Sequence, residues 1–371
     1  MRPLGIGLVG TGYMGKAHAV ALQSVGAVFN TRFRPVCEMI CSTTAEGAAC
    51  KAIELGFKSS SGHWQDLIAN PRVEALVIAS PPTTHREIAL AAFAAGKAVF
   101  CEKPLGSSLE DARAMADMAA ASKLPNMVGF NYIRAPAVQL AREMILSGEI
   151  GEIIHVRAEH TEDFLADPQA PASWRTRDVS SGNLGDLSPH IINAMLRLAG
   201  PIERVVAQMQ TVYSTRPGAN GPEAVRNDDQ ADFLCRFKSG AIGAITVSRV
   251  ATGSKLRYCF DIAGTKGALR FDAEDQNTLQ YYDAGLKPGR QGFSKLLTAP
   301  EHPDYGAFCE GPGHGTGYSA QIVIEARDFL RAIETHEAIS PTFEDGLQVS
   351  RIVAAISRSH TEERWVRIAE F

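Results

Sequence analysis

The first third of the chain alternates short apolar runs with segments rich in helix-forming residues. Residues 4–9 form a continuous apolar run that ends at a glycine-rich turn, and residues 14–22 then favour a helix. Further apolar runs lie at residues 34–41, 75–79 and 98–101, and helices are expected at residues 45–55, at residues 88–95 and from Ser108 onward. Strands that are apolar throughout are typical of a parallel sheet covered by helices on both faces. We therefore predict that residues 1–128 form a doubly wound α/β domain with a mainly parallel sheet.

The pattern changes after residue 128. Along residues 153–159, apolar side chains at 154, 156 and 158 alternate with polar ones at 155, 157 and 159, which is typical of an antiparallel strand with one exposed face. Further strands are expected at residues 205–213, 231–237, 242–247, 258–263 and 268–271, and helical apolar stripes at positions 322, 326, 329 and 333 and at positions 349, 352, 353 and 356. Residues 129–371 are therefore predicted to form an α+β domain with a large, mostly antiparallel open sheet.

Two features of this second domain bear on function. An exposed flat face on a large sheet commonly becomes a subunit interface, so we expect a homodimer or homotetramer. The glycine- and proline-rich segment 283–317 is longer than most connections in compact domains. It is expected to be either a lid on the substrate side or a disordered loop.

The composition supports two domains and a small partner. A chain of 371 residues exceeds one ordinary core, because domains average about 150 residues. The net charge is −4 without a basic run, so we expect no nucleic acid or membrane partner. Seven scattered cysteines without a C-x-x-C favour reduced thiols and no metal site. Without a signal peptide or a long apolar run, the protein is expected in the cytoplasm.

The glycine-rich turn after the first run reads G-x-G-x-x-G. The motif alone is weak, but here it follows a predicted strand and opens a predicted helix, which is the context that dinucleotide binding requires. The glycines allow a tight turn, close approach of a pyrophosphate and close helix packing, and the phosphates would lie on the positive helix end. The expected cofactor-binding residues of this turn are Gly10, Thr11, Gly12, Tyr13, Met14 and Gly15.

The end of the second strand bears on which dinucleotide is held. A site for NAD usually places an acid there to bind the ribose hydroxyls. Two positions compete, because Glu38 is acidic but lies mid-strand, whereas Ser42 ends the strand. If Ser42 is the position, no carboxylate repels a 2′-phosphate, yet no arginine follows to attract one. The sequence leans weakly towards NADP or dual use over strict NAD.

Three further groups of residues are candidates for the catalytic or ligand-binding site. Lys103, within Glu102-Lys103-Pro104, follows a buried strand at the sheet edge where ligands bind. Its side chain can donate a hydrogen bond to a substrate hydroxyl. It can equally be a solvated lysine paired with Glu102. Asp186 and His190 share a helix face at i and i+4, which suits a carboxylate beside a proton-shuttling imidazole, although capping and packing would also explain them. At the same sheet edge as Lys103 lie Pro82 and His85.

The ordered set of motifs resembles one known family over essentially the whole chain. The motifs are Gly-Thr-Gly-Tyr-Met-Gly-Lys-Ala-His, Cys-Glu-Lys-Pro-Leu, Gly-Phe-Asn-Tyr, Ser-Trp-Arg, Gly-Asp-x-x-x-His and Gly-Thr-Lys-Gly. Together they resemble the glucose-fructose oxidoreductase / inositol dehydrogenase (Gfo/Idh/MocA) family. The segments 166–175 and 302–306 look most like its levoglucosan dehydrogenase and inositol dehydrogenase branch.

The resemblance implies a Rossmann domain, a substrate-binding and oligomerisation domain, and site residues. By this matching, Lys103 and Asp186 bind and polarise the reacting hydroxyl and His190 is the general base. The residues implied to line the cofactor are Ser80, Pro82, His85, Glu102, Lys103, Asn131, Trp174, Arg175 and Tyr318, with Arg134 and Asp163 as sugar contacts. Two departures matter: Ser42 replaces the expected acid, and Asn193 stands where the family commonly has aspartate.

The activity that these residues imply is oxidation of a secondary alcohol of a cyclic sugar, anhydrosugar or inositol by NAD or NADP. Two alternatives remain open at this point. A non-catalytic dinucleotide-binding regulator would be expected to lack Lys103 or His190. A glycosidase that uses a tightly held NAD would share the same residues but show no net cofactor turnover.

Overall fold

The computed structural model describes residues 2–371, and the chain divides into two compact units. One unit consists of the residues up to Arg134 together with Gly317–Ser350, and the other of Ala135–Thr316 together with Arg351–Phe371. This division differs from the predicted one, because residues 129–134 and 317–350, which were assigned to the second domain, belong to the first unit.

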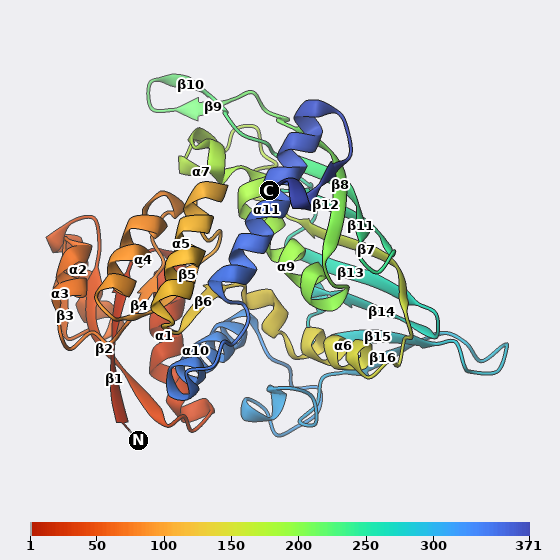
Figure 1. Cartoon of the computed structure of the whole chain (residues 1–371), viewed down its shortest axis with the longest axis horizontal. Coiled ribbons are helices and arrows are strands. Elements are labelled where there is room, and N and C mark those ends of the chain that lie inside the picture. Colours follow the sequence, from red (N-terminus) through yellow and green to blue (C-terminus); the bar gives the residue numbers. More distant parts are fainter. Residues whose placement is uncertain (1) are drawn as a thin grey trace. The chain divides into compact units, whose positions relative to one another are not determined.

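The first unit contains a parallel six-stranded sheet in the order β3-β2-β1-β4-β5-β6 (Figure 1). Its strands are β1 (Arg2–Val9), β2 (Phe33–Cys41), β3 (Ser59–Ser61), β4 (Ala75–Ile78), β5 (Ala98–Glu102) and β6 (Asn126–Gly129). Strands β4 and β5 are buried along their whole length, which explains their unbroken apolar sequence. The strand order reverses between β1 and β4, and in such folds ligands bind at this switch point, outside the carboxyl ends of the strands.

The helices of the first unit begin in different ways, and only some of them have a side-chain cap. They are α1 (Tyr13–Val28), α2 (Ala45–Leu55), α3 (Trp64–Ala69), α4 (His85–Ala94), α5 (Leu109–Ser122) and α10 (Tyr318–Thr335), with the 3₁₀ turns η1 (Pro82–Thr84) and η2 (Asn131–Arg134). Thr44 accepts a hydrogen bond from Gly47 N at the start of α2, and Gly56 ends it in the left-handed conformation. Ser108 caps α5 in the same way. Helix α4 begins three residues before the predicted 88, directly after the proline turn η1.

Helix α10 joins the first unit by packing on α1 and the sheet. The ring of Phe329 lies 5.8 Å from that of Phe100, and Phe343, at the start of α11, lies 5.5 Å from Phe93. The apolar stripe at 322, 326 and 329 is buried as predicted. Periodicity shows which face of a helix is buried, but it does not identify the sheet that covers that face. For this reason α10 was assigned to the second domain.

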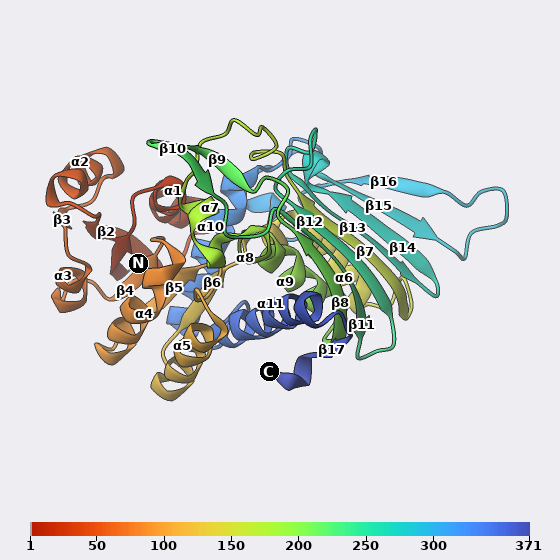
Figure 2. The same ribbon diagram turned by 90° about the horizontal axis from the view of Figure 1, so that it is seen from above.

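The second unit contains a nine-stranded sheet in the order β16-β15-β14-β13-β7-β12-β11-β8-β17 (Figure 2). All its neighbouring strands pair antiparallel except β7 and β12, which are parallel. The strands are β7 (Ile153–Thr161), β8 (Ile202–Gln210), β11 (Gln230–Phe237), β12 (Ile242–Ser248), β13 (Arg257–Gly264), β14 (Gly267–Asp272), β15 (Thr278–Asp283), β16 (Phe293–Leu297) and β17 (Val366–Arg367). A separate hairpin joins β9 (Thr215–Gly218) and β10 (Gly221–Ala224).

One face of this sheet is covered by helices. Those of the unit are α6 (Pro136–Leu146), α7 (Trp174–Arg177), α8 (Asn183–Asp186) and α9 (Ser188–Leu198), and α11 (Phe343–Glu362) ends in it. Along β7 the buried residues Val156, Ala158 and His160 alternate with exposed or half-buried ones, as predicted. Ile154 departs from this pattern because a register irregularity opposite Gly264 displaces the start of the strand.

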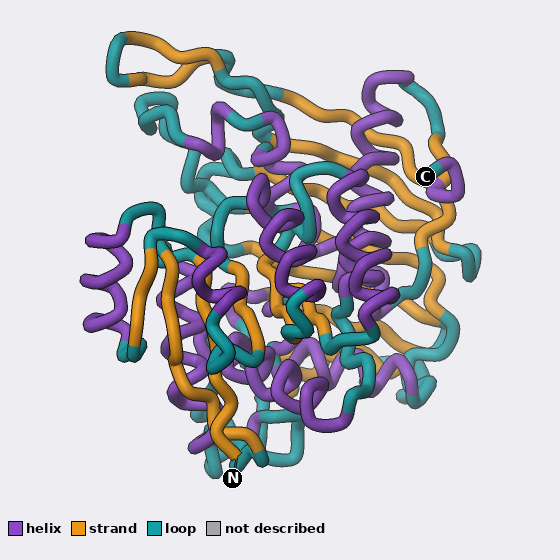
Figure 3. Tube along the Cα trace, turned by 60° about the vertical axis from the view of Figure 1, so that its left-hand side comes forward, coloured by secondary structure: helices purple, strands orange, loops and turns teal. Residues whose placement is uncertain are grey.

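The long segment 283–317 is folded. Its strand β16 pairs with β15, and its 3₁₀ turn η5 (Tyr305–Ala307) is held by the Tyr305 hydroxyl, which lies 2.9 Å from both Gly311 O and Gly315 N. The Asn277 side chain bonds the backbone of Thr316 on both sides, at 2.7 and 3.0 Å. Disorder is therefore the wrong expectation here, and a role as a lid stays a prediction. Figure 3 shows the hairpin of β9 and β10 apart from the other strands of this unit.

Candidate active site

The glycine-rich turn between β1 and α1 has a geometry that only glycine allows. Gly10 has a φ of +103°, and a Cβ there would lie 2.3 Å from the carbonyl oxygen of Ala79. A Cβ on Gly15 would lie 2.1 Å from the carbonyl oxygen of Gly10. A Cβ on Gly12 would meet nothing within 4 Å, so the backbone there faces open space. The turn is thus compact on its inner side and accessible on its outer side.

The start of α1 is suited to an anion. Gly12 is the N-cap of α1. The first turn of α1 contains no acidic residue, and no side chain forms a capping hydrogen bond there. Unsatisfied N–H groups and the positive end of the helix dipole together attract phosphate. The residues present therefore fit the pyrophosphate of a dinucleotide.

Tyr318 lies beside this turn and its ring is close to those of two other tyrosines. The Tyr318 hydroxyl lies 3.5 Å from the sulfur of Met14, and its ring centroid is 6.1 Å from that of Tyr13 and 5.9 Å from that of Tyr132. Tyr13 is 72% exposed. Tyr318, at the start of α10, was expected to line the cofactor and lies beside the glycine-rich turn.

The structure shows which of the two candidate residues, Glu38 or Ser42, lies at the end of β2. Glu38 is buried and forms ion pairs with Lys58 and Arg72. Burial alone would raise the pKa of Glu38, but the hydrogen bonds from Arg72 and Lys58 outweigh it and hold this pKa below its usual value. Ser42 follows β2 and its Oγ lies 3.2 Å from Oγ1 of Thr11 in the glycine-rich turn. Ser42 is thus the residue at the strand end, and Glu38 is engaged elsewhere.

The Glu102-Lys103-Pro104 segment is fixed from two sides. The Glu102 carboxylate lies 2.7 Å from Nε2 of His18 on α1, and its other oxygen accepts from the backbone N–H of Lys103 at 3.2 Å. His85 is fully buried, with its ring nitrogens 3.0 Å from Pro104 O and 2.9 Å from Ser80 O. Burial lowers the pKa of His85, and in its neutral form the ring can donate to only one of these two carbonyl oxygens.

The other expected residues of the first unit have these positions. The Ser80 hydroxyl lies 2.7 Å from that of Thr84, and Pro82 is the first residue of η1. The buried Asn131 amide donates to Gln321 on α10 at 2.8 Å. Arg134 is buried, pairs with Asp328 at 2.7 Å and donates to Ser340 O at 3.0 Å. These contacts give Arg134 a structural role in holding α10, and the sugar contact that the resemblance implied stays a prediction.

Asp186 and His190 lie on two consecutive short helices of the second unit. Asp186 ends α8, His190 is the third residue of α9, and Leu187 lies between the helices. The sequence predicted one continuous helix, but Pro189 lacks the N–H that would continue the hydrogen bonding of α8. His190 is 6% exposed, and its backbone N–H donates to Leu187 O at 3.3 Å.

Trp174 and Arg175 lie beside Asp186. Nε of Arg175 is 3.4 Å from the Asp186 carboxylate, and its guanidinium lies over the Trp174 ring at 4.3 Å and over the Phe164 ring at 5.9 Å. The family resemblance implied that Trp174 and Arg175 line the cofactor. It did not indicate the contact between Arg175 and Asp186. Asp163 accepts from Lys255 Nζ at 2.7 Å and from Gly253 N at 3.2 Å. The Lys255 hydrogen bond lowers the pKa of Asp163.

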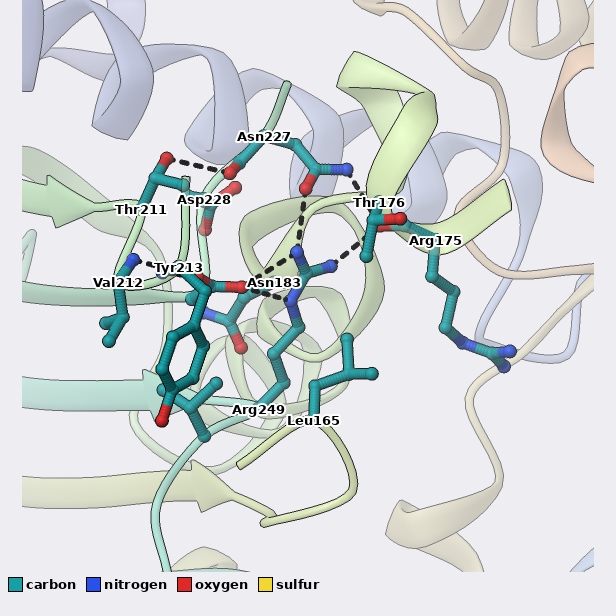
Figure 4. Close-up of polar contacts among 12 residues, drawn as sticks. Leu165, Arg175, Thr176, Asn183, Thr211, Val212, Tyr213, Asn227, Asp228 and Arg249 are labelled. Carbon is teal, nitrogen blue, oxygen red and sulfur yellow. Dashed lines mark hydrogen bonds and ion pairs between the residues drawn. The ribbon is translucent and has the colours of Figure 1, made fainter. Parts of the chain in front are cut away.

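A buried arginine anchors the segment that leads to Asp186 (Figure 4). Arg249, at 1% exposure, pairs with Asp229 at 2.9 Å and donates to the carbonyl oxygens of Arg175 at 2.8 Å and Ser181 at 3.2 Å. It also donates to Oδ1 of Asn227 at 2.7 Å. The backbone before η3 (Val179–Ser181) and at its last residue is thereby held to Arg249, which follows β12.

Sequence reasoning missed this anchor. Arg249 follows β12 and Asp229 precedes β11. In the sequence alone, each is therefore only a charged residue next to a strand. Only the pairing of β11 with β12 brings them together. The run Asn227-Asp228-Asp229 was the one available signal, because polar residues in a row before an apolar strand need partners if they are buried.

The expected residues fall into two groups by unit. The glycine-rich turn, Ser42, the Ser80–His85 turn, Lys103 and Tyr318 belong to the first unit. Asp163, Trp174, Arg175, Asp186 and His190 belong to the second. Residues 2–371 contain no cluster of three or more potential metal ligands and no helix with the length and apolarity needed to cross a membrane. All seven cysteines are free thiols.

Comparison with known proteins identifies the family. Residues 4–130 match the model described as oxidoreductase family, NAD-binding Rossmann fold, and residues 138–270 match the GFO/IDH/MocA C-terminal domain. Levoglucosan dehydrogenase of Pseudarthrobacter phenanthrenivorans is 37% identical, with 100% of this chain and 99% of that protein covered. Inositol 2-dehydrogenase of Rhizobium meliloti is 29% identical, with 98% of each protein covered.

Solved structures agree in fold. A levoglucosan dehydrogenase in complex with NADH and L-sorbose has a TM-score of 0.97 at 37% identity, with 99% of each chain covered. An oxidoreductase domain protein from Kribbella flavida has a TM-score of 0.96 at 38% identity, with 99% of this chain and 100% of that chain covered. This chain therefore belongs to the Gfo/Idh/MocA family and is an NAD-dependent oxidoreductase.

Proposed function

We propose that the protein is a dehydrogenase that oxidises a secondary alcohol of a cyclic sugar, anhydrosugar or inositol. The observation that carries this proposal is that one chain combines a glycine-lined anion site at the start of α1 with the Asp186 and His190 pair. A non-catalytic regulator would have no need of Lys103, Asp186 and His190 together. The related proteins are named as dehydrogenases and oxidoreductases, which favours turnover over both regulation and glycoside hydrolysis.

Each of the three residues has a distinct proposed role. His190 accepts the hydroxyl proton of the substrate at a ring nitrogen as the carbonyl forms. Lys103 donates a hydrogen bond to the same oxygen and stabilises the negative charge that develops on it. Asp186 accepts a hydrogen bond from the substrate and, through Arg175, is tied to the Trp174 ring. The bound dinucleotide supplies the hydride acceptor, so the substrate loses one hydride and one proton overall.

The substrate class rests on the relatives and on the polar and aromatic groups beside Asp186. The most similar relatives named above act on levoglucosan and inositol, and one solved structure holds L-sorbose. Trp174 and Phe164 are 47% and 41% exposed, so their rings are accessible to the apolar face of a sugar ring. Asn193 replaces the aspartate common in the family, and its amide can donate where a carboxylate can only accept.

For the cofactor, we propose NAD with NADP also accepted. Ser42 and Thr11 offer hydroxyls at the end of β2, where a carboxylate would otherwise repel a 2′-phosphate. The proposed cofactor contacts outside the glycine-rich turn are Ser42, Ser80, Pro82, His85, Glu102, Lys103, Asn131, Trp174, Arg175 and Tyr318. Of these, His85, Glu102 and Asn131 are buried and would act mainly by fixing the backbone that the cofactor contacts.

We also propose that the protein works as a homodimer or homotetramer in the cytoplasm. On the outer face of the sheet, Leu234 and Ile242 are 48% and 52% exposed beside a depression of about 640 Å³ between β8, β11 and β12. Apolar side chains on an open sheet face favour association with a second copy. If a Leu234→Lys variant sediments at the same mass as the unmodified protein, this face is not the subunit interface.

The function is tested with purified protein, NAD or NADP, and a panel of inositols, aldoses and anhydrosugars. Formation of reduced nicotinamide, followed by absorbance, is the expected result for at least one member of the panel. Release of a reducing sugar without net cofactor reduction would instead indicate a glycosidase. Tight dinucleotide binding with no reaction across the panel would indicate a regulator.

A further inference from the structure

A second histidine lies directly behind His190. His160, on β7, is fully buried and faces the covered side of the sheet. Its ring centroid is 5.6 Å from that of His190, with 66° between the rings, and 5.4 Å from that of Tyr258 on its other side. The proposed chemistry makes no use of His160, yet a buried histidine in edge-to-face contact with the proposed base affects where that base can lie.

Both ring nitrogens of His160 face oxygen atoms. Nδ1 lies 2.9 Å from the carbonyl oxygen of Leu187, and Nε2 lies 3.2 Å from a carboxylate oxygen of Glu162. A carbonyl oxygen has no hydrogen to give, so Nδ1 must be the donor. Nε2 then faces an acceptor as well, and this contact is favourable only if a proton lies between the ring and Glu162.

The Leu187 carbonyl is the point at which His160 acts on the site. Leu187 separates Asp186, at the end of α8, from the first turn of α9. Its carbonyl oxygen also accepts the backbone N–H of His190 at 3.3 Å. One oxygen atom therefore receives hydrogen bonds from the ring of His160 and from the backbone of His190, and the break between the two helices is held at this point.

We propose that His160 is a positioning residue for His190 and that Glu162 fixes the ring of His160 for this task. The proposal rests on the proposed function of His190 as the general base. His160 touches neither substrate nor cofactor in this scheme. It sets the Leu187 turn by its Nδ1–H, limits the rotation of the His190 ring by its own ring, and is itself oriented by the carboxylate of Glu162, which is partly exposed.

Two conservative variants separate the two hydrogen bonds. The side-chain nitrogen of asparagine can occupy the position of Nδ1, so His160→Asn can keep the bond to Leu187. The longer glutamine places its nitrogen near the position of Nε2, so His160→Gln can keep the bond to Glu162 and lose the one to Leu187. His160→Phe keeps the ring packing and loses both bonds. His155→Phe is the matched control, because His155 lies on the same strand and on the opposite face.

The kinetic test measures kcat and KM for the best substrate of the panel, together with dinucleotide binding. The Gln and Phe variants are expected to lower kcat by about tenfold to a hundredfold, as loss of a buried hydrogen bond allows, with dinucleotide binding unchanged. The Asn variant is expected to recover most of kcat, and His155→Phe to match the unmodified enzyme. Full activity of His160→Phe, or equal losses in the Asn and Gln variants, would overturn the proposal.

A second readout does not depend on turnover. With labelled histidine, nitrogen NMR should show a hydrogen-bonded Nδ1–H on His160, and the His190 ring signals should shift in His160→Phe but not in His155→Phe. Unchanged His190 signals in a folded His160→Phe protein would overturn the positioning role. If no substrate of the panel reacts, the proposed function fails, while these signals still decide whether His160 orients His190.

Discussion

At the scale of the residue, one hydroxyl at the end of β2 bears on cofactor choice. Ser42 lies beside Thr11 of the glycine-rich turn, and Glu38 is engaged by Lys58 and Arg72. Ser42→Asp should place a negative charge where the 2′-phosphate of NADP would lie. We expect binding of NADP to weaken by at least about tenfold relative to NAD, because like charges in contact cost several kcal/mol. Dissociation constants for both dinucleotides provide the measurement.

The control for this change is Ser239→Asp, which adds the same charge in an exposed turn of the second unit. It should leave the ratio of the two constants unaltered. If Ser42→Asp also leaves that ratio unaltered, Ser42 does not face the adenosine ribose and the preference is set elsewhere.

Single residues differ in how far the sequence predicts them. The geometry of Gly10 and Gly15 could be predicted because it depends on a local turn. The short spacing of Asp186 and His190 suggested one helix but not the break between α8 and α9, and their roles stay predictions. The partners of His160 and Arg249 lie about 20 residues or more away in sequence, at Leu187 and Asp229. Such contacts depend on strand pairing, which no local pattern specifies, so both histidine and arginine were missed.

At the scale of the element, the segment from α7 to α8 depends on its anchor. Arg249 binds the backbone at Arg175, before η3, and at Ser181, the last residue of η3. Arg249→Met should leave the Asp229 charge buried without its partner and lower the free energy of unfolding by about 3–5 kcal/mol. The double variant Arg249→Met with Asp229→Asn should lose less, because no unpaired charge is then buried. Chemical denaturation of both variants measures the difference.

If the double variant is as unstable as the single one, the backbone contacts of Arg249 matter more than its charge. In that case Trp174 fluorescence, measured with Trp64 and Trp365 replaced by phenylalanine, should report a displaced segment. Unaltered stability in Arg249→Met would contradict the anchor itself.

Elements were predicted well where they are regular and less well where they are interrupted. Many strands of the two sheets and the apolar stripes of α10 and α11 follow from apolar runs and from period-two and helical patterns. The strands β3, β6, β15, β16 and β17 were not predicted. The stripe Gln321, Glu325 and Asp328 on α10 was not expected to be buried, since such residues are mostly exposed. Its burial follows from the return of α10 to the first unit, which the sequence did not show.

At the scale of the whole molecule, this buried polar stripe makes stability depend on pH. In the described residues neither carboxyl oxygen of Glu325 has a hydrogen-bond partner. Burial, and then the nearby Glu102 charge, raise the pKa of Glu325 well above its usual value. Above about pH 4.3 the unfolded chain releases this proton while the folded protein keeps it, so the free energy of unfolding should fall as the pH rises towards the folded pKa.

Glu325→Gln removes the titrating proton and should flatten this decline. Chemical denaturation at about pH 5 and about pH 8 compares the variant with the unmodified protein, since each pH unit in the window is worth about 1.4 kcal/mol. Glu334→Gln, at an exposed position of the same helix, is the control and should retain the decline. Equal pH dependence in all three proteins would mean that Glu325 ionises normally.

The central claim is that Lys103 and His190 carry out alcohol oxidation with the dinucleotide held at the start of α1. The most direct measurement is the rate of nicotinamide reduction with saturating cofactor and the best substrate of the panel, for the unmodified protein, Lys103→Met and His190→Asn. We predict that each variant turns over at least about a hundredfold more slowly at saturating cofactor, since general acid–base groups contribute that much or more. His190→Asn should bind the dinucleotide with unchanged affinity, whereas Lys103→Met should bind it more weakly, because Lys103 is also a proposed cofactor contact. Turnover at the unmodified rate in either variant would contradict the account.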